Sequence, residues 1–290
     1  MKRLKKWGLL VVLLLVILSC TGCKQDDMED IDIIVTNYSN EYITSKLYGS
    51  HSNISSIYPD DIDINKYKIT DKQKRDFSKK SLFIYNGLNK NERNLAVDLL
   101  DLNGNLKIID TAYALDENYS EEELWLNPSS LLMMAKNVEL GLNEYITSNY
   151  LKKEIKENFE KLKVELSELD ADYRVAVNDT TNKTIVVNSN NLKYLEKFGL
   201  NVIVIDNDAS PKTISDVDSR MKSEEISYIY KFKGDTLSDN SKKLLDKYSD
   251  VKENDLHRID NLTDQEREDN KNYLSIMKDN LKQLKEEMYQ

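Results

Sequence analysis

Residues 148–170 read SNYLKKEIKENFEKLKVELSELD, and this stretch decides the architecture. Its apolar residues recur at intervals of 4, 4, 3, 4 and 3, the period of one face of an α-helix. They are Leu151, Ile155, Phe159, Leu162, Leu166 and Leu169. The pattern predicts a long amphipathic helix with Ser148 as its cap. Because patterns of strands and helices flank it on both sides, we expect a stiff rod that joins two lobes.

Short apolar runs rich in β-branched or aromatic residues predict buried strands before and after this helix. They lie at 31–36, 82–86, 106–110, 184–187, 202–206 and 228–231. Helical spacing separates the runs, which predicts an α/β protein with mainly parallel sheets. A second helical stripe, from Tyr273 to Met288, predicts a final helix docked on the second lobe. The expected organisation is a lobe at 31–147, a linking helix at 148–170 and a lobe at 171–290.

The first residues of the chain predict export and lipid attachment. Four of the first six residues are basic, and an unbroken apolar run follows from Leu9 to Leu18. That run is too short to span a bilayer, which takes about 20 residues, and is typical of a secretory signal. The end of the run, SCTGC, resembles a bacterial lipoprotein signal, in which a diacylglycerol is attached to a cysteine and the chain is cut before it.

Cys23 is the expected lipidation site, with Cys20 as the alternative, and an ordinary signal anchor is the other interpretation. We therefore expect a signal peptide at 1–22 and a polar tether at 23–30. Two or three acyl chains would hold the body firmly on a membrane. The predicted location is the outer face of the cell membrane, or the periplasm where there are two membranes.

Composition excludes several classes of function. The predicted signal peptide carries four basic and no acidic residues, so its removal takes the net charge from −10 to −14. An acidic surface argues against nucleic acid as a partner. No cysteine follows Cys23, which excludes disulfides, thiolate zinc sites and cysteine nucleophiles from the mature chain. His51 and His257 are the only histidines. We find no catalytic constellation and expect no enzyme.

Several segments, taken in order, resemble the substrate-capture proteins of zinc and manganese ABC transporters, a group that includes the adhesion lipoproteins. The most specific is SLFIYNGL at 81–88, which is similar to the second-strand motif of that family. WLNP at 125–128 is similar to the family's WLDP segment, and NYLSIMKDNL at 272–281 resembles its terminal helix. The segments at 34–49 and 184–200 match in the same order. The resemblance covers nearly the whole mature chain.

The resemblance implies a fold and a set of partners. Such proteins have two α/β lobes joined by one long rigid helix, a helical-backbone variant of the periplasmic-binding-protein architecture, with a metal site in the cleft. They are expected to close only modestly on their ligand, to be monomers, and to deliver it to an ABC permease with its ATPase. The alternative is a degenerate member that has lost metal binding and acts as a surface interaction or adhesion lipoprotein.

Four loops of the family each supply one metal ligand, and the resemblance carries these positions onto the chain. Asn65 and Glu123 stand where the family has histidines, in its D-P-H-x-Y-E-P and H-x-W-L patterns. The third position, a histidine or glutamate in the family, falls on Ser189, and Asn190 remains an alternative. Asp260 matches the aspartate that the family has late in the chain. The implied set is therefore mostly changed from the family pattern.

This set offers oxygen ligands only. Zinc favours His nitrogen and Cys sulfur, whereas two carboxylates suit harder cations such as Mn²⁺, Mg²⁺ or Ca²⁺. An amide and a hydroxyl are weak donors, so we expect at most weak binding of a divalent metal ion. Complete loss of metal binding stays open as the other outcome. Both histidines are expected to have surface or structural roles, with His51 exposed.

Overall fold

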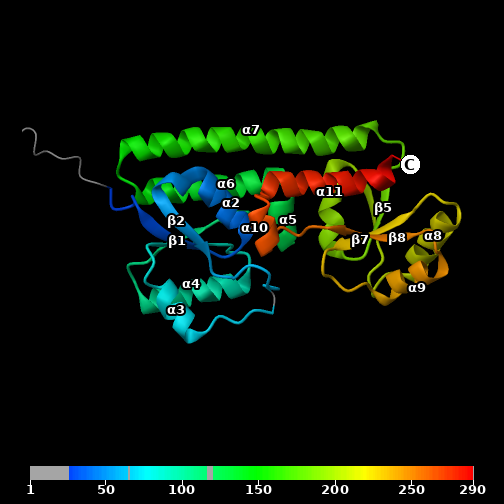
Figure 1. Ribbon diagram of the computed structural model, residues 1–290, viewed down its shortest axis with the longest axis horizontal. Helices are drawn as coiled ribbons and strands as arrows, with labels where there is room; N and C mark the ends of the chain where they lie inside the picture. The colour runs from blue at the N-terminus through cyan, green and yellow to red at the C-terminus, as the bar shows by residue number, and fades with distance from the viewer. Residues whose placement is uncertain (1–25, 65, 116–119, 290) are drawn as a thin grey trace, which may run out of the picture.

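The computed structural model describes residues 26–64, 66–115 and 120–289. Two parallel sheets, each of four strands, lie at opposite ends of an elongated body (Figure 1). The predicted fold class, an α/β protein of two lobes, is confirmed. The predicted signal peptide and the lipidation site at Cys23, with its alternative Cys20, lie outside the described residues. In these three ranges, no helix has both the length and the apolarity needed to cross a membrane.

The first lobe is built on a sheet with the strand order β2-β1-β3-β4, all parallel. Helices connect the strands on both faces, as parallel pairing requires. Its elements are β1 (Ile31–Val35), α2 (Tyr38–Tyr48), η1 (Gly49–His51), β2 (Ser52–Ser56), α3 (Asp71–Phe77), β3 (Leu82–Tyr85), α4 (Lys90–Leu102), β4 (Lys107–Asp110), α5 (Glu121–Leu126) and α6 (Pro128–Tyr145).

The second lobe repeats this topology with the order β6-β5-β7-β8, again all parallel. It is smaller, and η2 replaces the first α-helix of the repeat. Its elements are β5 (Thr184–Val187), η2 (Asn190–Phe198), β6 (Asn201–Val204), α8 (Pro211–Lys222), β7 (Tyr228–Phe232), α9 (Asp239–Lys247), β8 (Lys252–Leu256), α10 (Asp264–Glu268) and α11 (Tyr273–Met288).

The long helix α7 (Asn149–Asp179) runs along one edge of both lobes (Figure 1). All six residues of its predicted apolar stripe are buried, and the Ser148 hydroxyl accepts the Leu151 N–H as expected of a cap. The helix continues nine residues beyond the predicted end at Asp170. Tyr173 extends the buried face there, and its hydroxyl donates to the carbonyl of Met277 on α11 at 2.7 Å. One hydrophobic core joins the two lobes beneath α7.

All six predicted strands are present, but β2 and β8 were not predicted. Their sequences, SNISS and KENDL, are polar. Each is an edge strand that pairs on one side only, and most of its residues are partly or fully exposed, whereas the edge strands β4 and β6 keep a short apolar run. Such a strand does not need the continuous apolar run by which a central parallel strand is recognised.

Residues 26–30, which the sequence assigns to the tether at 23–30, belong to the folded body. Met28 is fully buried, and its carbonyl accepts a hydrogen bond from Tyr48 at 2.6 Å. Asp26 Oδ2 accepts the N–H groups of Thr147 and Ser148 at 2.8 and 2.6 Å, just before α7. Burial alone would raise the pKa of Asp26, but these hydrogen bonds and one from Met28 lower it to about 2. The sequence of the acidic segment around Asp26 does not indicate that its carboxylate binds the turn before α7, which is far away in the chain.

The chain crosses from the second lobe back to the first between β8 and α11. After β8, the carbonyl of Asp260 accepts the Tyr38 N–H at 2.9 Å, and the carbonyl of Leu262 accepts the Asp61 N–H at 3.1 Å. Arg267, on α10, forms ion pairs with Glu41 at 2.7 Å and with Asp60 at 2.5 Å. This crossing segment, residues 257–267, therefore positions the predicted fourth metal ligand between the lobes.

Candidate functional site

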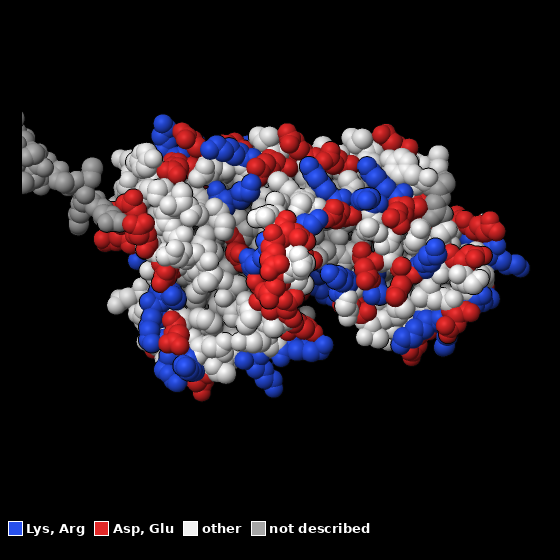
Figure 2. Space-filling model, in the orientation of Figure 1, with Lys and Arg blue, Asp and Glu red and all other residues white. Residues whose placement is uncertain are grey.

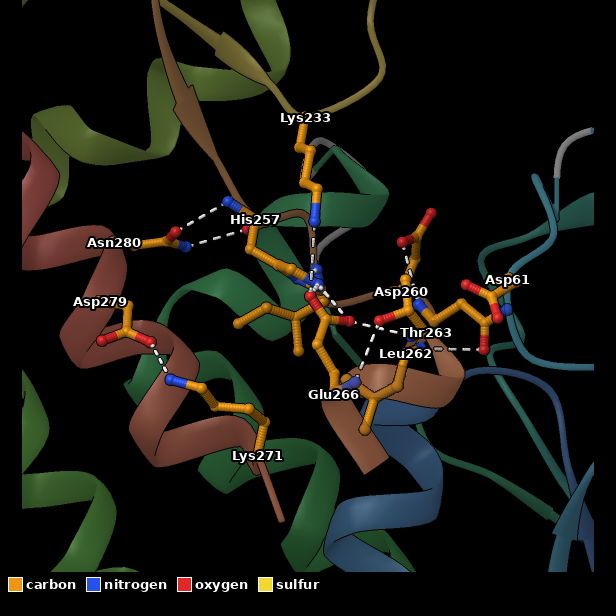
Figure 3. A network of polar contacts seen from close by, with 12 residues as sticks. Asp61, Lys233, His257, Asp260, Leu262, Thr263, Glu266, Lys271, Asp279 and Asn280 are labelled. Carbon is orange, nitrogen blue, oxygen red and sulfur yellow. Dashed lines mark hydrogen bonds and ion pairs between the residues drawn. The ribbon is translucent and has the colours of Figure 1, made fainter. Parts of the chain in front are cut away.

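A polar cavity of about 380 Å³ lies where the crossing segment meets both lobes. The first lobe contributes the loop at 61–63, the second contributes the turn at 233–235, and the crossing segment forms the floor. Figure 3 shows Asp260 and Asp61 to one side of this cavity and His257 with Lys233 to the other. Acidic side chains gather over α10 and the residue after it, in the middle of the molecule (Figure 2). Their exposed members are Asp264, Glu268 and Asp269.

Of the predicted metal ligands that the structure describes, Asp260 alone lines this cavity. Its Oδ1 accepts the N–H of Asn261 at 2.9 Å. Burial raises the pKa of the Asp260 carboxyl, while the Arg258 guanidinium acts in the opposite direction. Just before it, Ile259 is fully buried with φ 61°, a left-handed conformation that is costly for a β-branched residue. The fold holds this strained turn in place and so fixes where Asp260 points.

His257 has a structural role at this turn, as the sequence predicted. Its Nδ1 accepts the Ile259 N–H at 2.8 Å, and its Nε2 lies 3.3 Å from both carboxylate oxygens of Glu266 (Figure 3). Asn280 bonds both the N–H and the carbonyl of His257, at 2.7 and 2.9 Å. His51 was expected to be exposed, but its side chain is only 18% exposed and pairs with Glu154 at 3.1 Å.

Glu123, Ser189 and its alternative Asn190 do not line the cavity. Glu123, on α5, forms an ion pair with Lys197 of η2. The Ser189 hydroxyl accepts the N–H of Asn191 at 3.2 Å and so caps η2. Its alternative, Asn190, donates to Asp206 Oδ2 at 3.2 Å. Asn65 lies outside the described residues.

Among residues 26–64, 66–115 and 120–289, no three His, Cys, Asp or Glu side chains are grouped so that they could hold a metal ion. The predicted set, which includes an amide and a hydroxyl, is of a different kind and stays a prediction. In the present arrangement Glu123 would have to leave Lys197 before it could bind a metal. The described residues thus do not form a ready site for a transition metal.

The guanidinium of Arg258 joins the two lobes. Arg258 Nη1 lies 2.7 Å from Glu122 Oε1 on α5 of the first lobe. Its Nη2 lies 2.5 Å from Asp235 Oδ1, which follows β7 of the second lobe, and its Nε lies 3.9 Å from Asp260 Oδ2. The guanidinium carbon also lies 4.6 Å from the ring centroid of Phe232, a cation–π distance.

The WLNP segment supports this contact from the first lobe. Trp125 Nε1 donates to the carbonyl of Arg258 at 2.8 Å, and the Trp125 carbonyl accepts the Tyr273 hydroxyl at 2.6 Å. Asn127 caps α6 and Pro128 occupies its first turn. The segment therefore places α5 against both the crossing segment and the final helix.

Comparison with known proteins decides the family. The family described as zinc-uptake complex component A, periplasmic (ZnuA), matches residues 33–287. The chain belongs to this family. That confirms the resemblance drawn from the YNGL, WLNP and terminal-helix segments. Family membership covers both lobes, the linking helix and the crossing segment.

A curated relative and two solved structures are similar to this chain. The zinc-binding lipoprotein AdcA of Streptococcus pneumoniae (strain ATCC BAA-255 / R6) is 25% identical over 98% of this chain, which spans 61% of that protein's length. The Zn(II)-bound ZnuA-like domain of S. pneumoniae AdcA is 22% identical, covers 90% of this chain and all of that one, and superposes with a TM-score of 0.72. The laminin-binding protein Lbp of Streptococcus pyogenes is 18% identical over 90% of this chain and 99% of that one, with a TM-score of 0.69.

The cleft comprises the cavity together with the ion pairs beside it that link α5 to the second lobe and the crossing segment. Sequence reasoning missed three of its residues, Glu122, Arg258 and Lys197. One signal was available: three consecutive glutamates open α5, and neighbouring helical residues point about 100° apart. Glu122 and Glu123 therefore meet different partners on the second lobe. Nothing in the sequence around Arg258 marks it as the bridging cation, because its partners come from segments 23 and 136 residues away.

Proposed function

We propose that this chain is the lipid-anchored solute-binding component of an ABC importer of the ZnuA family. It would take a divalent cation between its lobes and deliver it to a permease driven by an ATPase. Membership of the family carries the proposal, and the two-lobed body with a polar cavity at the crossing segment supports it. The curated relative named above is a zinc-binding lipoprotein. No enzymatic activity forms part of the proposal.

The proposed ligand is a hard divalent cation bound weakly through oxygen. Asp260 supplies a half-buried carboxylate at the cavity, and the other positions offer one further carboxylate, an amide and a hydroxyl. Such donors suit Mn²⁺, Mg²⁺ or Ca²⁺ better than Zn²⁺. The cation would complete its coordination with water, as hard cations commonly do.

Thermal denaturation with added metal tests this proposal. A ligand that binds only the folded state stabilises it by RT ln(1 + [L]/Kd), about 2.7 kcal/mol when the ligand is at 100 Kd. We expect a small rise in melting temperature with millimolar MnCl₂ or CaCl₂ and none with micromolar ZnCl₂. Asp260→Ala should abolish the rise, while Asp246→Ala, an exposed carboxylate on α9, should leave it unchanged. Micromolar or tighter zinc binding would contradict the proposed ligand class.

Lipid attachment is tested separately. Cys23→Ser should abolish incorporation of a labelled palmitate into the expressed protein and release the body from the membrane fraction. Cys20→Ser is the matched control and should do neither. If Cys20→Ser alone abolishes incorporation, the anchor is at the other cysteine, and labelling that survives both changes would exclude a cysteine anchor.

A second candidate function is a surface interaction lipoprotein that keeps the fold but does not transport a metal. The observation that favours it is the pairing of cleft carboxylates with the chain's own cations, Arg258 and Lys197. A gene deletion distinguishes the two functions. Slower growth in chelated medium, restored by excess metal or by the intact gene, supports import, whereas unchanged growth favours the interaction protein.

A further inference from the structure

The cleft contains a cation of its own, and that cation reaches both lobes. Glu122 projects from the first lobe and accepts two donors at Oε1, Arg258 Nη1 at 2.7 Å and Asn191 Nδ2 at 2.9 Å. Asn191 lies on η2 of the second lobe. On the other side of the guanidinium, Asp235 comes from the second lobe. A single arginine thus joins carboxylates that belong to different lobes.

This contact is withdrawn from solvent. The side chains of Arg258 and Glu122 are only 17% and 13% exposed, and the ring of Phe232 packs against the guanidinium. Ion pairs that are shielded in this way are screened less by salt and have a fixed geometry, unlike pairs on an open surface. The planar guanidinium, with several donors in one plane, can satisfy carboxylates on more than one side at once.

Lys197 repeats the arrangement next to it. It pairs with Glu123. Each of the two consecutive glutamates on α5 therefore has a cationic partner from a segment that follows the linking helix in the chain. Of the two predicted carboxylate ligands, Glu123 is therefore paired with Lys197, and Asp260 Oδ2 lies 3.9 Å from Arg258 Nε.

We propose that Arg258 takes the place of a bound cation in this cleft, joining the lobes and weakening the binding of metal cations there. The inference rests on the proposed function only in taking the cleft as the ligand site. A side chain held by its own backbone is always present, whereas a metal ion must be captured from solution. A cation that binds Asp260 would lie next to the guanidinium that Glu122 and Asp235 hold in place. Repulsion between the two positive charges would therefore limit the affinity of the cleft for metal ions.

Metal titration of three proteins tests whether Arg258 weakens metal binding. Arg258→Gln removes the charge and Arg258→Lys keeps it, and binding of MnCl₂ and ZnCl₂ is measured by calorimetry for both variants and the wild-type chain, each first shown to be folded by its metal-free melting curve. We expect Arg258→Gln to bind at least about tenfold more tightly than wild type, because a unit charge within about 4 Å acts strongly even at an effective dielectric constant near 20. Arg258→Lys should stay within about threefold of wild type.

The outcomes separate this inference from the proposed function. Tighter binding by Arg258→Gln supports the inference, and if wild type then binds nothing, the inference stands while cation capture by the natural chain fails. Equal binding by wild type and Arg258→Gln overturns the inference and leaves cation capture intact. If neither protein binds, both fail.

A distance measurement on the intact chain tests the joining of the lobes without relying on a destabilised variant. Cys20→Ser and Cys23→Ser remove the only native thiols, and spin labels are placed at Lys72→Cys on α3 and Lys243→Cys on α9, both exposed. We expect one narrow distance distribution that is the same with chelator and with ZnCl₂. A distribution that narrows or shifts only when metal is added would overturn the inference, because the metal would then be what joins the lobes.

Discussion

Glu92 and Glu122, in two different regions of this protein, are both shielded from solvent, but in different ways. Glu92, at the start of α4, is 5% exposed, and its Oε2 accepts the Asn86 N–H at 2.6 Å. Burial raises its pKa to about 8, despite hydrogen bonds from Thr36 and Asn86, so it holds a proton at neutral pH. Glu122, in the cleft, instead faces Arg258. At Glu92 a proton neutralises the acid, whereas at Glu122, between the lobes, a side-chain cation does so.

The largest expected effect tests the protonated glutamate. Because the folded pKa of Glu92 lies above its ordinary value of 4.5, its contribution to stability is complete below pH 4.5 and is lost as pH rises toward 8. From pH 5 to pH 9 this group should remove on the order of 4–5 kcal/mol from the free energy of unfolding. Glu92→Gln should abolish most of that fall, measured by urea denaturation at several pH values.

A control for this first prediction is Glu144→Gln, at a partly exposed glutamate near the end of α6. It should leave the pH profile as in wild type. A Glu92→Gln profile that falls as steeply as wild type between pH 5 and 9 would show that Glu92 is ionised in the folded protein.

The next largest effect is expected at Arg258, the cation that pairs with Glu122. Arg258→Met should lower the free energy of unfolding by about 3 kcal/mol, because it leaves shielded carboxylates without a partner. Arg93→Met, at an exposed arginine on α4, should change it by less than about 0.5 kcal/mol. Chemical denaturation at pH 7 measures both. If Arg258→Met costs no more than its control, the guanidinium does not stabilise the junction.

A smaller effect concerns Asp26, a carboxylate stabilised by N–H donors. Asp26→Ala should lower the free energy of unfolding by about 1–2 kcal/mol, as loss of a helix cap does. Since the folded pKa of Asp26 is lowered from 3.8 to about 2, its contribution is present above pH 3.8 and disappears as pH falls toward 2. Asp27→Ala, at the exposed neighbour, is the control. A wild-type and an Asp26→Ala melting temperature that differ equally at pH 2 and pH 7 would contradict this origin.

The smallest effect is expected at the more exposed ion pair of the cleft. Lys197 is 36% exposed, so Lys197→Met should change the free energy of unfolding by less than about 1 kcal/mol. High salt should abolish even that difference, because exposed pairs are screened. A loss as large as that of Arg258→Met would mean that both cations hold the junction equally.

Periodicity and family resemblance predicted most of the framework but little of the cleft. Central strands and long helices carry their own apolar patterns, so buried residues such as Leu151 and Ile155 can be recognised from their sequence neighbours alone. The edge strands β2 and β8 lack such a pattern because most of their residues are at least partly exposed, whereas the edge strands β4 and β6 carry one. The final turns of α7 were also missed, because the polar residues Asp170 and Asp172 interrupt the apolar stripe that Tyr173 continues.

Motif positions identified where the candidate ligands lie along the chain but not which groups they face. Asp260 reaches the cavity because a strained turn at Ile259 directs it there, which no local sequence rule foresees. Glu123 was chosen by its place in the motif, yet it binds Lys197, and its neighbour Glu122 meets Arg258. These pairings join residues far apart in the chain, so they follow only from the packing of the two lobes.

The attachment of Asp26 to the turn before α7 limits how far the body can stand from a membrane. Cys23 lies three residues before Asp26, and three residues of extended chain reach about 10 Å. If Cys23 carries the lipid, the end of the protein at which α7 begins must rest close to the bilayer surface. So short a tether would prevent the body from rotating freely. The cavity would therefore face a permease within a restricted range of distances from the membrane and of tilt angles.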